Sequence, residues 1–220
     1  MAEPRTVEDR LRSEYAELLP LMHRTRLAVE TEVQHMLLPI TLHLDPYERI
    51  VVRSRIKECE SAVDAVRRRQ EFGFFDTDNP EQYSLRSLPD LVGVRVLTFP
   101  DRRLEEARQS LLPRIADWID DPVPGEDPAA APIAYKYSGL WTTNDVVRSE
   151  IQVVSLLIGL FWEAEHSAIY KPTPNLRGAA KSIEMKRKTA AVIAALKDFE
   201  VEFGRLISAS GDTALDENDN

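Results

Sequence analysis

A carboxylate and an amide alternate with apolar residues in the order Glu150, Ile151, Gln152 and Val153. This two-residue period is typical of a half-buried strand, because successive side chains of a strand point to opposite faces of the sheet. Glu150 and Gln152 are therefore expected side by side on one face. That face carries the polar groups of the strand.

A helix with a polar row is expected directly after this strand. Residues 156–161 are almost wholly apolar, and they lead into Trp162, Glu165, His166 and Tyr170, whose spacing places them along one side of a helix. Such polar groups are costly to bury without partners, so two interpretations stay open. The row lines a functional site, or Glu165 and His166 bond each other or the backbone inside the core.

Three basic residues, Arg53, Arg55 and Lys57, lie close together at the end of a β-branched run. The run predicts a strand, and a helix is expected to begin near Ser61. The cluster can hold phosphates, because arginine offers a planar fork of donors and lysine a compact charge. The alternative is a solvated basic edge that pairs with neighbouring glutamates.

Two charged residues interrupt the apolar stretch at residues 88–99, which otherwise predicts a buried strand. Asp90 lies near the beginning of this strand and Arg95 lies within it. An acid at the edge of a strand can ligate magnesium.

These groups, taken in order, resemble the RelA/SpoT-type alarmone synthetase domain. The matching positions are Arg55, Lys57 and Ser61, then Asp90, Gly93 and Arg95, then Glu150, Ile151 and Gln152, then Trp162, Glu165, His166, Tyr170 and Lys171. The resemblance covers residues 53–171. Family members often carry a lysine four residues after the serine, where this chain has Ala65, and Arg67, Arg68 or Arg69 is the candidate substitute.

The acceptor loop of the family is altered in this chain. The family pattern G-Y-R-S-x-H falls on residues 136–141, where Tyr137 alone is retained and Trp141 replaces the histidine. In another register Tyr135 would be the stacking residue, and neither register restores the histidine. The resemblance therefore implies relaxed or altered choice of acceptor.

The resemblance implies an enzyme that transfers pyrophosphate from ATP to the 3′-hydroxyl of GDP or GTP, making (p)ppGpp-type alarmones with Mg²⁺ as cofactor. It implies Asp90 and Glu150 as catalytic residues and metal ligands. It implies ATP binding by Arg55, Lys57, Ser61 and Arg95. It implies acceptor binding by Tyr137, Gln152, Glu165 and His166. Toxin-like transfer of pyrophosphate to the 3′ end of tRNA and a non-catalytic nucleotide-binding module stay open as alternatives.

The fold implied by the resemblance is α+β, with a nucleotidyltransferase-like mixed β-sheet flanked by helices and with helical extensions at both ends. We expect an N-terminal helical segment over residues 1–49, a synthetase core over 50–171, a C-terminal helical segment over 172–207 and a disordered acidic tail over 208–220. Thr6 is expected to cap the first helix, and Pro20 is expected to kink or divide it. Residues 71–86 are expected to form a loop, a candidate lid.

Composition narrows the class of protein. The chain has 220 residues, 43% of them hydrophobic, one cysteine and a formal net charge of −9. This charge disfavours unspecific binding to nucleic acid, and one cysteine rules out an internal disulfide. The sequence has no long apolar run, so we expect a cytoplasmic protein without membrane contact, with its terminal helices as a candidate surface for a homo-oligomer.

Overall fold

The computed structural model describes residues 6–125, 131–141, 145–165 and 182–216. Its strands form one five-stranded sheet in the order β1-β2-β5-β4-β3. The strands are β1 Arg49–Ile56, β2 Val92–Phe99, β3 Ile119–Asp120, β4 Ala134–Leu140 and β5 Arg148–Ser155. The α-helices are α1 Val7–Thr41, α2 Cys59–Arg68, α3 Arg102–Leu111, α4 Leu156–Glu165 and α6 Ile183–Asp216. Short 3-10 turns are η1 Pro80–Gln82, η2 Leu85–Ser87 and η3 Leu112–Arg114.

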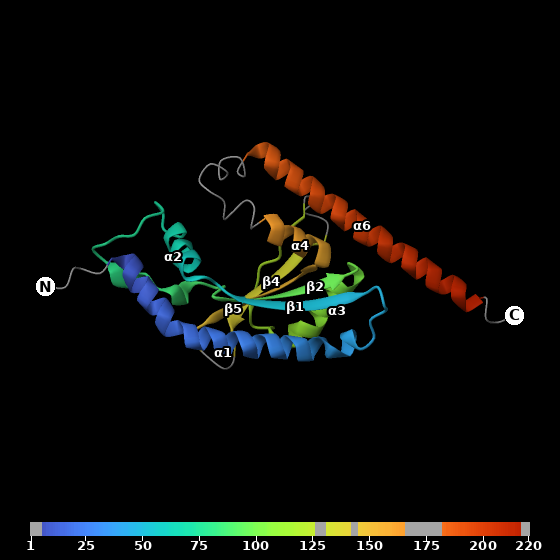
Figure 1. The fold of residues 1–220 in the computed structure, drawn as a ribbon, viewed down its shortest axis with the longest axis horizontal. Coiled ribbons are helices and arrows are strands. Elements are labelled where there is room, and N and C mark those ends of the chain that lie inside the picture. Colours follow the sequence, from blue (N-terminus) through green and yellow to red (C-terminus); the bar gives the residue numbers. More distant parts are fainter. Residues whose placement is uncertain (1–5, 126–130, 142–144, 166–181, 217–220) are drawn as a thin grey trace.

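The sheet is mixed, because β2 and β5 are parallel while the other neighbouring strands are antiparallel. Helices lie on both sides of it, with α1 along one side and α4 and α6 on the other (Figure 1). The predicted α+β class with a mixed sheet flanked by helices is therefore confirmed.

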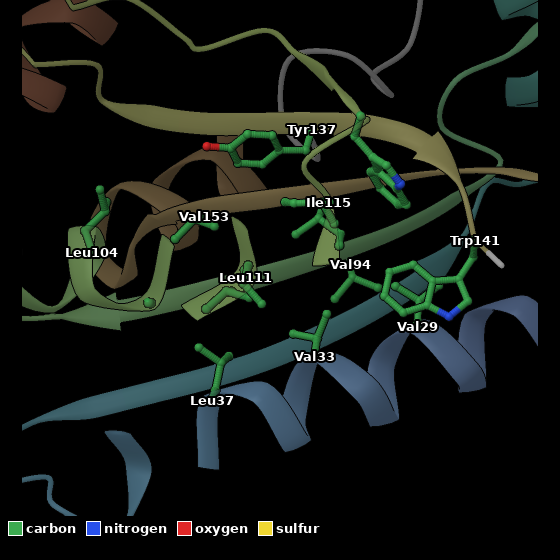
Figure 2. Packing of buried hydrophobic residues seen from close by; sticks show 14 of the residues in the cluster. Val29, Val33, Leu37, Val94, Leu104, Leu111, Ile115, Tyr137, Trp141 and Val153 are labelled. Carbon is green, nitrogen blue, oxygen red and sulfur yellow. The ribbon is translucent and has the colours of Figure 1, made fainter. Parts of the chain in front are cut away.

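One face of the sheet, which we call the closed face, packs against α1 and α3. Val29, Val33 and Leu37 of α1 meet strand residues such as Val94 and Val153, and all five side chains are buried (Figure 2). The alternation of the strands supplies this apolar face, and the periodicity of the two helices supplies the residues that cover it. The closed face is the main core of the protein.

Helix α1 runs without a break from Val7 to Thr41, so Pro20 does not divide it, and Figure 1 shows the helix bending in its first half, in agreement with the expected kink. Thr6 caps the helix as predicted, its side chain accepting a hydrogen bond of 3.1 Å from the backbone N–H of Asp9. Leu18 and Met22, on either side of Pro20, are both buried in one cluster with α2. Burying each is worth about 1.5–3 kcal/mol, which offsets the roughly 3 kcal/mol that an interior proline costs.

Helix α6 covers part of the opposite face, which we call the open face. Ile193 and Leu196 pack on a cluster formed by Leu97, Val154 and Ile158. Figure 1 shows α6 extending well beyond the sheet. The helix ends at Asp216, so it continues past Ile207, where the C-terminal helical segment was expected to end.

The segment between α2 and β2 is loop-like, as expected, but parts of it are anchored. Tyr83 and Leu85 are buried in the cluster that α1 and α2 form. Among the described residues, no helix is both long enough and apolar enough to cross a membrane.

Candidate functional site

Two rows of polar side chains cross the open face. In one row Arg53 pairs with Arg95, Arg95 with Gln152 and Gln152 with Lys136. In the next row the paired residues are Arg55, Gly93, Glu150 and Ser138. Directly paired residues of neighbouring strands point to the same face, so segments far apart in the sequence meet here. This confirms that Glu150 and Gln152 share a face.

A cavity of about 440 Å³ opens beside these rows, next to α2. Its walls bring acids and bases together, and they are formed by Lys57, Ala65, Arg68, Arg69, Pro89, Asp90, Asp121, Lys136, Tyr137, Ser138 and Glu150. Four predicted site residues, Lys57, Asp90, Tyr137 and Glu150, therefore border one cavity. Their approach depends on the parallel pairing of β2 and β5, which brings the beginnings of both strands to the same edge of the sheet.

Each of the two central carboxylates is paired with a lysine. Lys57 Nζ donates a hydrogen bond to Asp90 Oδ2, and Lys136 Nζ lies 3.4 Å from Glu150 Oε2. Lys136 also lies 3.6 Å from Asp121. The sequence reasoning missed Lys136 as a site residue, although its alternation with the tyrosines on either side places it on the same face as Glu150.

The carboxylates of this cavity fit a magnesium ion whose other ligands are substrate phosphates and water. Asp90 and Glu150 supply carboxylate oxygens to one cavity, and Mg²⁺ is usually held by one or two carboxylates together with phosphates and water. Among the described residues there is no group of three or more metal-binding side chains that would form a complete protein cage. Asp90 and Glu150 would hold the ion, as the resemblance implies.

Hydrogen bonds connect the two rows to α4. Arg95 Nε donates to Gln152 Oε1 over 3.0 Å, and Gln152 Nε2 donates to Glu150 Oε1 over 2.5 Å. From α4, Glu163 accepts a hydrogen bond of 2.7 Å from Arg53 and lies 3.6 Å from Arg95. Glu163 thus positions the arginine side of the site. No spacing in the sequence indicates this contact, because it depends on how α4 lies on the sheet.

The guanidinium of Arg95 is poorly hydrated. Burial lowers its pKa, and the positive charge of Arg55 adds to this effect, while Glu163 and Glu150 act in the opposite direction. Its side chain is 19% exposed. The guanidinium groups of Arg55 and Arg95, on a partly buried surface, are favourable partners for a flat π system or an anion.

The last turn of α2 supplies positive charge to the cavity. Arg68 and Arg69 line it, whereas Arg67 donates a hydrogen bond of 2.7 Å to Glu8 of α1. Arg68 and Arg69 are therefore the better substitutes for the lysine that Ala65 replaces. Ser61 lies in α2 but does not line the cavity, so its predicted contact with ATP is not supported by its position.

The stacking role expected for Tyr137 requires correction. Residues 134–140 form strand β4 rather than a loop, and the ring of Tyr137 points to the closed face, where the residue is 2% exposed (Figure 2). Its hydroxyl accepts a hydrogen bond of 2.8 Å from Arg108 Nε. Tyr135 lies on the same face, with the Arg108 guanidinium 4.5 Å above its ring. Neither register therefore presents a tyrosine ring to a nucleotide.

Trp141 is also part of the core and is 2% exposed. Its ring meets Trp118 edge to face, with centroids 5.8 Å apart, and Arg114 lies 4.7 Å above it. Gly139 makes this packing fit, because a Cβ atom there would come within 2.5 Å of the Trp118 ring. Gly139 and Trp141, which replace the serine and the histidine of the family pattern, thus serve packing, and the buried Trp141 ring is not presented to a ligand.

Glu165 contacts helix α6 and does not line the cavity. It accepts a hydrogen bond of 3.2 Å from Thr189 of α6, so its described contact is with a helix rather than with the cavity. The partner is a side chain of another helix, a contact that neither of the two interpretations from the sequence named. His166, Tyr170 and Lys171 lie outside the described residues.

Comparisons with solved structures identify relatives in fold. Small alarmone synthetase 1 from Bacillus subtilis has 16% identity and a TM-score of 0.62, over 91% of this chain and 99% of that protein. The same protein bound to its product pppGpp has 15% identity and a TM-score of 0.64, over 90% and 99%. A GTP pyrophosphokinase family protein from Streptococcus pneumoniae has 18% identity and a TM-score of 0.62, over 91% and 96%. No family model matches the chain, and a search of curated proteins finds no match. The chain therefore has the fold of the small alarmone synthetases.

Proposed function

We propose that the protein transfers the β,γ-pyrophosphate of ATP to the 3′-hydroxyl of GDP or GTP. The observation that carries this proposal is the cavity in which Asp90 and Glu150 meet Lys57, Arg68 and Arg69. Phosphoryl-type transfer needs two oxygen donors for a metal, cations for the phosphates and a base, and this set contains all three. The fold shared with structures of synthetases supports the same proposal.

ATP binds across the first two strands in this proposal. Arg55 and Arg95 hold the adenine between their guanidinium planes, and Lys57 meets the phosphates. The contact of Lys57 with Asp90 keeps the ammonium in the cavity before ATP arrives. Arg68 and Arg69 extend the positive charge of the cavity along the end of α2, beyond the place of the ATP phosphates.

The reaction is an in-line displacement at the β-phosphorus of ATP. The 3′-oxygen of the acceptor forms the new bond, the bond from the β-phosphorus to the α,β-bridging oxygen breaks, and AMP leaves with that oxygen. Glu150 takes the hydroxyl proton, and its contacts with Gln152 and Lys136 hold the carboxylate towards the cavity. A magnesium ion held by Asp90 and Glu150 would offset the negative charge on the phosphates.

A transfer assay tests this proposal. The protein is incubated with Mg²⁺ and ATP labelled in the γ-phosphate, with GDP, GTP or tRNA in separate reactions, and the labelled products are separated. We expect label in a guanosine product and loss of transfer when the metal is chelated. Label in tRNA alone, or label that stays in ATP with every acceptor, would reject the proposed reaction.

Asp90→Asn and Glu150→Gln should each lower transfer by about 10²-fold or more, because each removes charge with little change in volume. Glu17→Gln is the matched control, since Glu17 is an exposed acid on α1. Circular dichroism spectra that match the wild type would show that the folds are intact. A central variant that transfers as fast as the control would contradict the role of that carboxylate.

A further inference from the structure

Two phenylalanines are exposed next to each other just after α2. Phe72 is 73% exposed and Phe74 is 64% exposed, and their rings stack with centroids 5.7 Å apart and planes 19° from parallel. Exposed apolar surface of this kind is costly in water and often marks a binding site. The pair is separate from the residues that line the cavity.

The backbone builds this arrangement. Gly73, between the two phenylalanines, has a φ of 70°, a conformation that glycine adopts without steric cost. Its N–H donates a hydrogen bond of 3.2 Å to the carbonyl of Gln70, which ties the turn to the end of α2. Because the turn is bonded to the helix on one side, the two rings have a defined place on the surface.

The other side of the turn is anchored in the protein. Phe75 is 9% exposed, its ring centroid lies 4.9 Å from that of Tyr83, and the Arg67 guanidinium lies 5.2 Å from its ring centroid. The backbone N–H of Asp76 donates a hydrogen bond of 2.7 Å to the Tyr83 hydroxyl. The chain thus buries the third phenylalanine and leaves the first two outside, which argues against a simple failure to pack.

Positively charged residues of the cavity come directly before this pair in the sequence. Arg68 and Arg69 line the cavity, and Phe72 follows Arg69 by three residues. Arg69 is held in place by a hydrogen bond of 2.9 Å to the carbonyl of Ser87. A ligand that carries an anionic group and a flat ring can contact the arginines and the phenylalanines together.

We propose that Phe72 and Phe74 form a stacking platform for the base of the acceptor nucleotide, with Arg68 and Arg69 holding its phosphates. This inference rests on the proposed function. The acceptor is the better occupant than ATP, because Arg55 and Arg95 already provide a place for adenine. A free nucleotide is the better occupant than RNA, because a chain of net charge −9 repels a long polyanion.

The platform supplies the aromatic surface that β4 does not present to a base. Tyr135, Tyr137 and Trp141 all pack on the closed face or in the core, so β4 presents no aromatic ring to a base. The rings of Phe72 and Phe74 already stack on each other, so a base would stack on the free face of one of them. Stacking on phenylalanine tolerates any base, which predicts affinity with weak discrimination between GDP and ADP as acceptors.

Binding of labelled GDP and of ATP, each with Mg²⁺, tests the platform by equilibrium dialysis. The double variant Phe72→Ala/Phe74→Ala should bind GDP about tenfold or more weakly, and ATP within about twofold of wild type. Phe72→Tyr/Phe74→Tyr should restore GDP binding, because the rings return. Phe199→Ala is the matched control, since Phe199 is 53% exposed and stacks on Phe203 of the same helix α6.

The outcomes separate the platform from the proposed function. Wild-type transfer to GDP with equal GDP affinity in the double-alanine variant would overturn the platform alone. Equal losses for GDP and ATP would also overturn it, because the rings would then not be specific to the acceptor. A wild-type protein that binds neither nucleotide would overturn both proposals. Loss of binding to an RNA ending in CCA, with GDP binding unchanged, would overturn the choice of a free nucleotide.

Discussion

The two faces of the sheet carry different residue types and serve different purposes. On the closed face Tyr137 and Trp141 are each 2% exposed and pack under α1 and α3. On the open face Lys136 of β4 and Glu150 of β5 line the cavity. Successive residues of β4 thus alternate between the core and the site. The alternation of the strand decides which residue a ligand can reach, and residue type alone does not.

The open face itself has two parts. One part carries the charged rows and the cavity, and the other is covered by α4 and α6 through an apolar cluster with Ile158 at its centre. Two glutamates of the covering helices lie at the border between the charged rows and the apolar cluster. Glu163 of α4 reaches Arg53 and Arg95, and Glu200 of α6 reaches the beginning of α4. These two glutamates, together with Tyr137, allow the comparison to be tested.

The largest effect is expected on the closed face. Tyr137→Ala should lower the free energy of unfolding by about 3–5 kcal/mol, because it removes a buried ring and leaves a cavity. Tyr137→Phe should cost only about 0.5–1.5 kcal/mol, since it removes one hydrogen bond to Arg108. Urea unfolding measures both. GDP affinity in Tyr137→Phe should equal that of wild type, and stability unaffected by Tyr137→Ala would show that the ring is not a core residue.

Glu200 is buried at the contact between α6 and α4, with 1% of the residue exposed. Its Oε1 accepts a hydrogen bond of 3.2 Å from the backbone N–H of Leu157. Burial raises the pKa of Glu200 to about 7, against hydrogen bonds from Ser155 and Leu157 that lower it. Between its ordinary value of 4.5 and 7, the folded protein therefore binds more protons than the unfolded chain. The free energy of unfolding must then fall as the pH rises through this window.

Glu200→Gln should remove this dependence. At pH 8 we expect the variant to be more stable than wild type by roughly 1–3 kcal/mol, and at pH 4 to be about equal, because glutamine resembles the protonated acid. Burial also raises the pKa of Asp101, so a smaller slope of the same sign should remain. Unfolding at a series of pH values measures the slope. Glu202→Gln is the control on the exposed side of α6, and an equal change there would show that burial is not the cause.

The smallest effect is expected at the border of the charged rows. Glu163→Gln should raise the KM for ATP about five- to tenfold, because Arg53 and Arg95 lose the carboxylate that positions them. The effect is modest because Glu163 is 39% exposed. Glu165→Gln, which changes a contact with α6, should leave the KM for ATP unchanged. Steady-state kinetics at varied ATP concentration measure both KM values. An equal rise of the KM for ATP in the two variants would contradict the role of Glu163.

The sequence alone determined the parts that depend on local periodicity. Glu150 and Gln152 share a face because the strand alternates, and the polar residues Arg53, Arg55 and Arg95 recur on strands for the same reason. The mixed sheet with flanking helices also followed from the ordered motifs. Local signals of this kind survive folding, because they describe how each element divides its side chains between two faces.

Only the tertiary structure decided what each face meets. It placed Tyr137 and Trp141 in the core, because β4 joins the sheet with these rings towards α3 and Trp118. It turned Glu165 towards α6, and it brought Glu163 to two arginines from β1 and β2. It also kept α1 continuous through Pro20, because burial on both sides of the proline offsets its cost. Contacts between elements distant in sequence set these outcomes, and no local spacing encodes them.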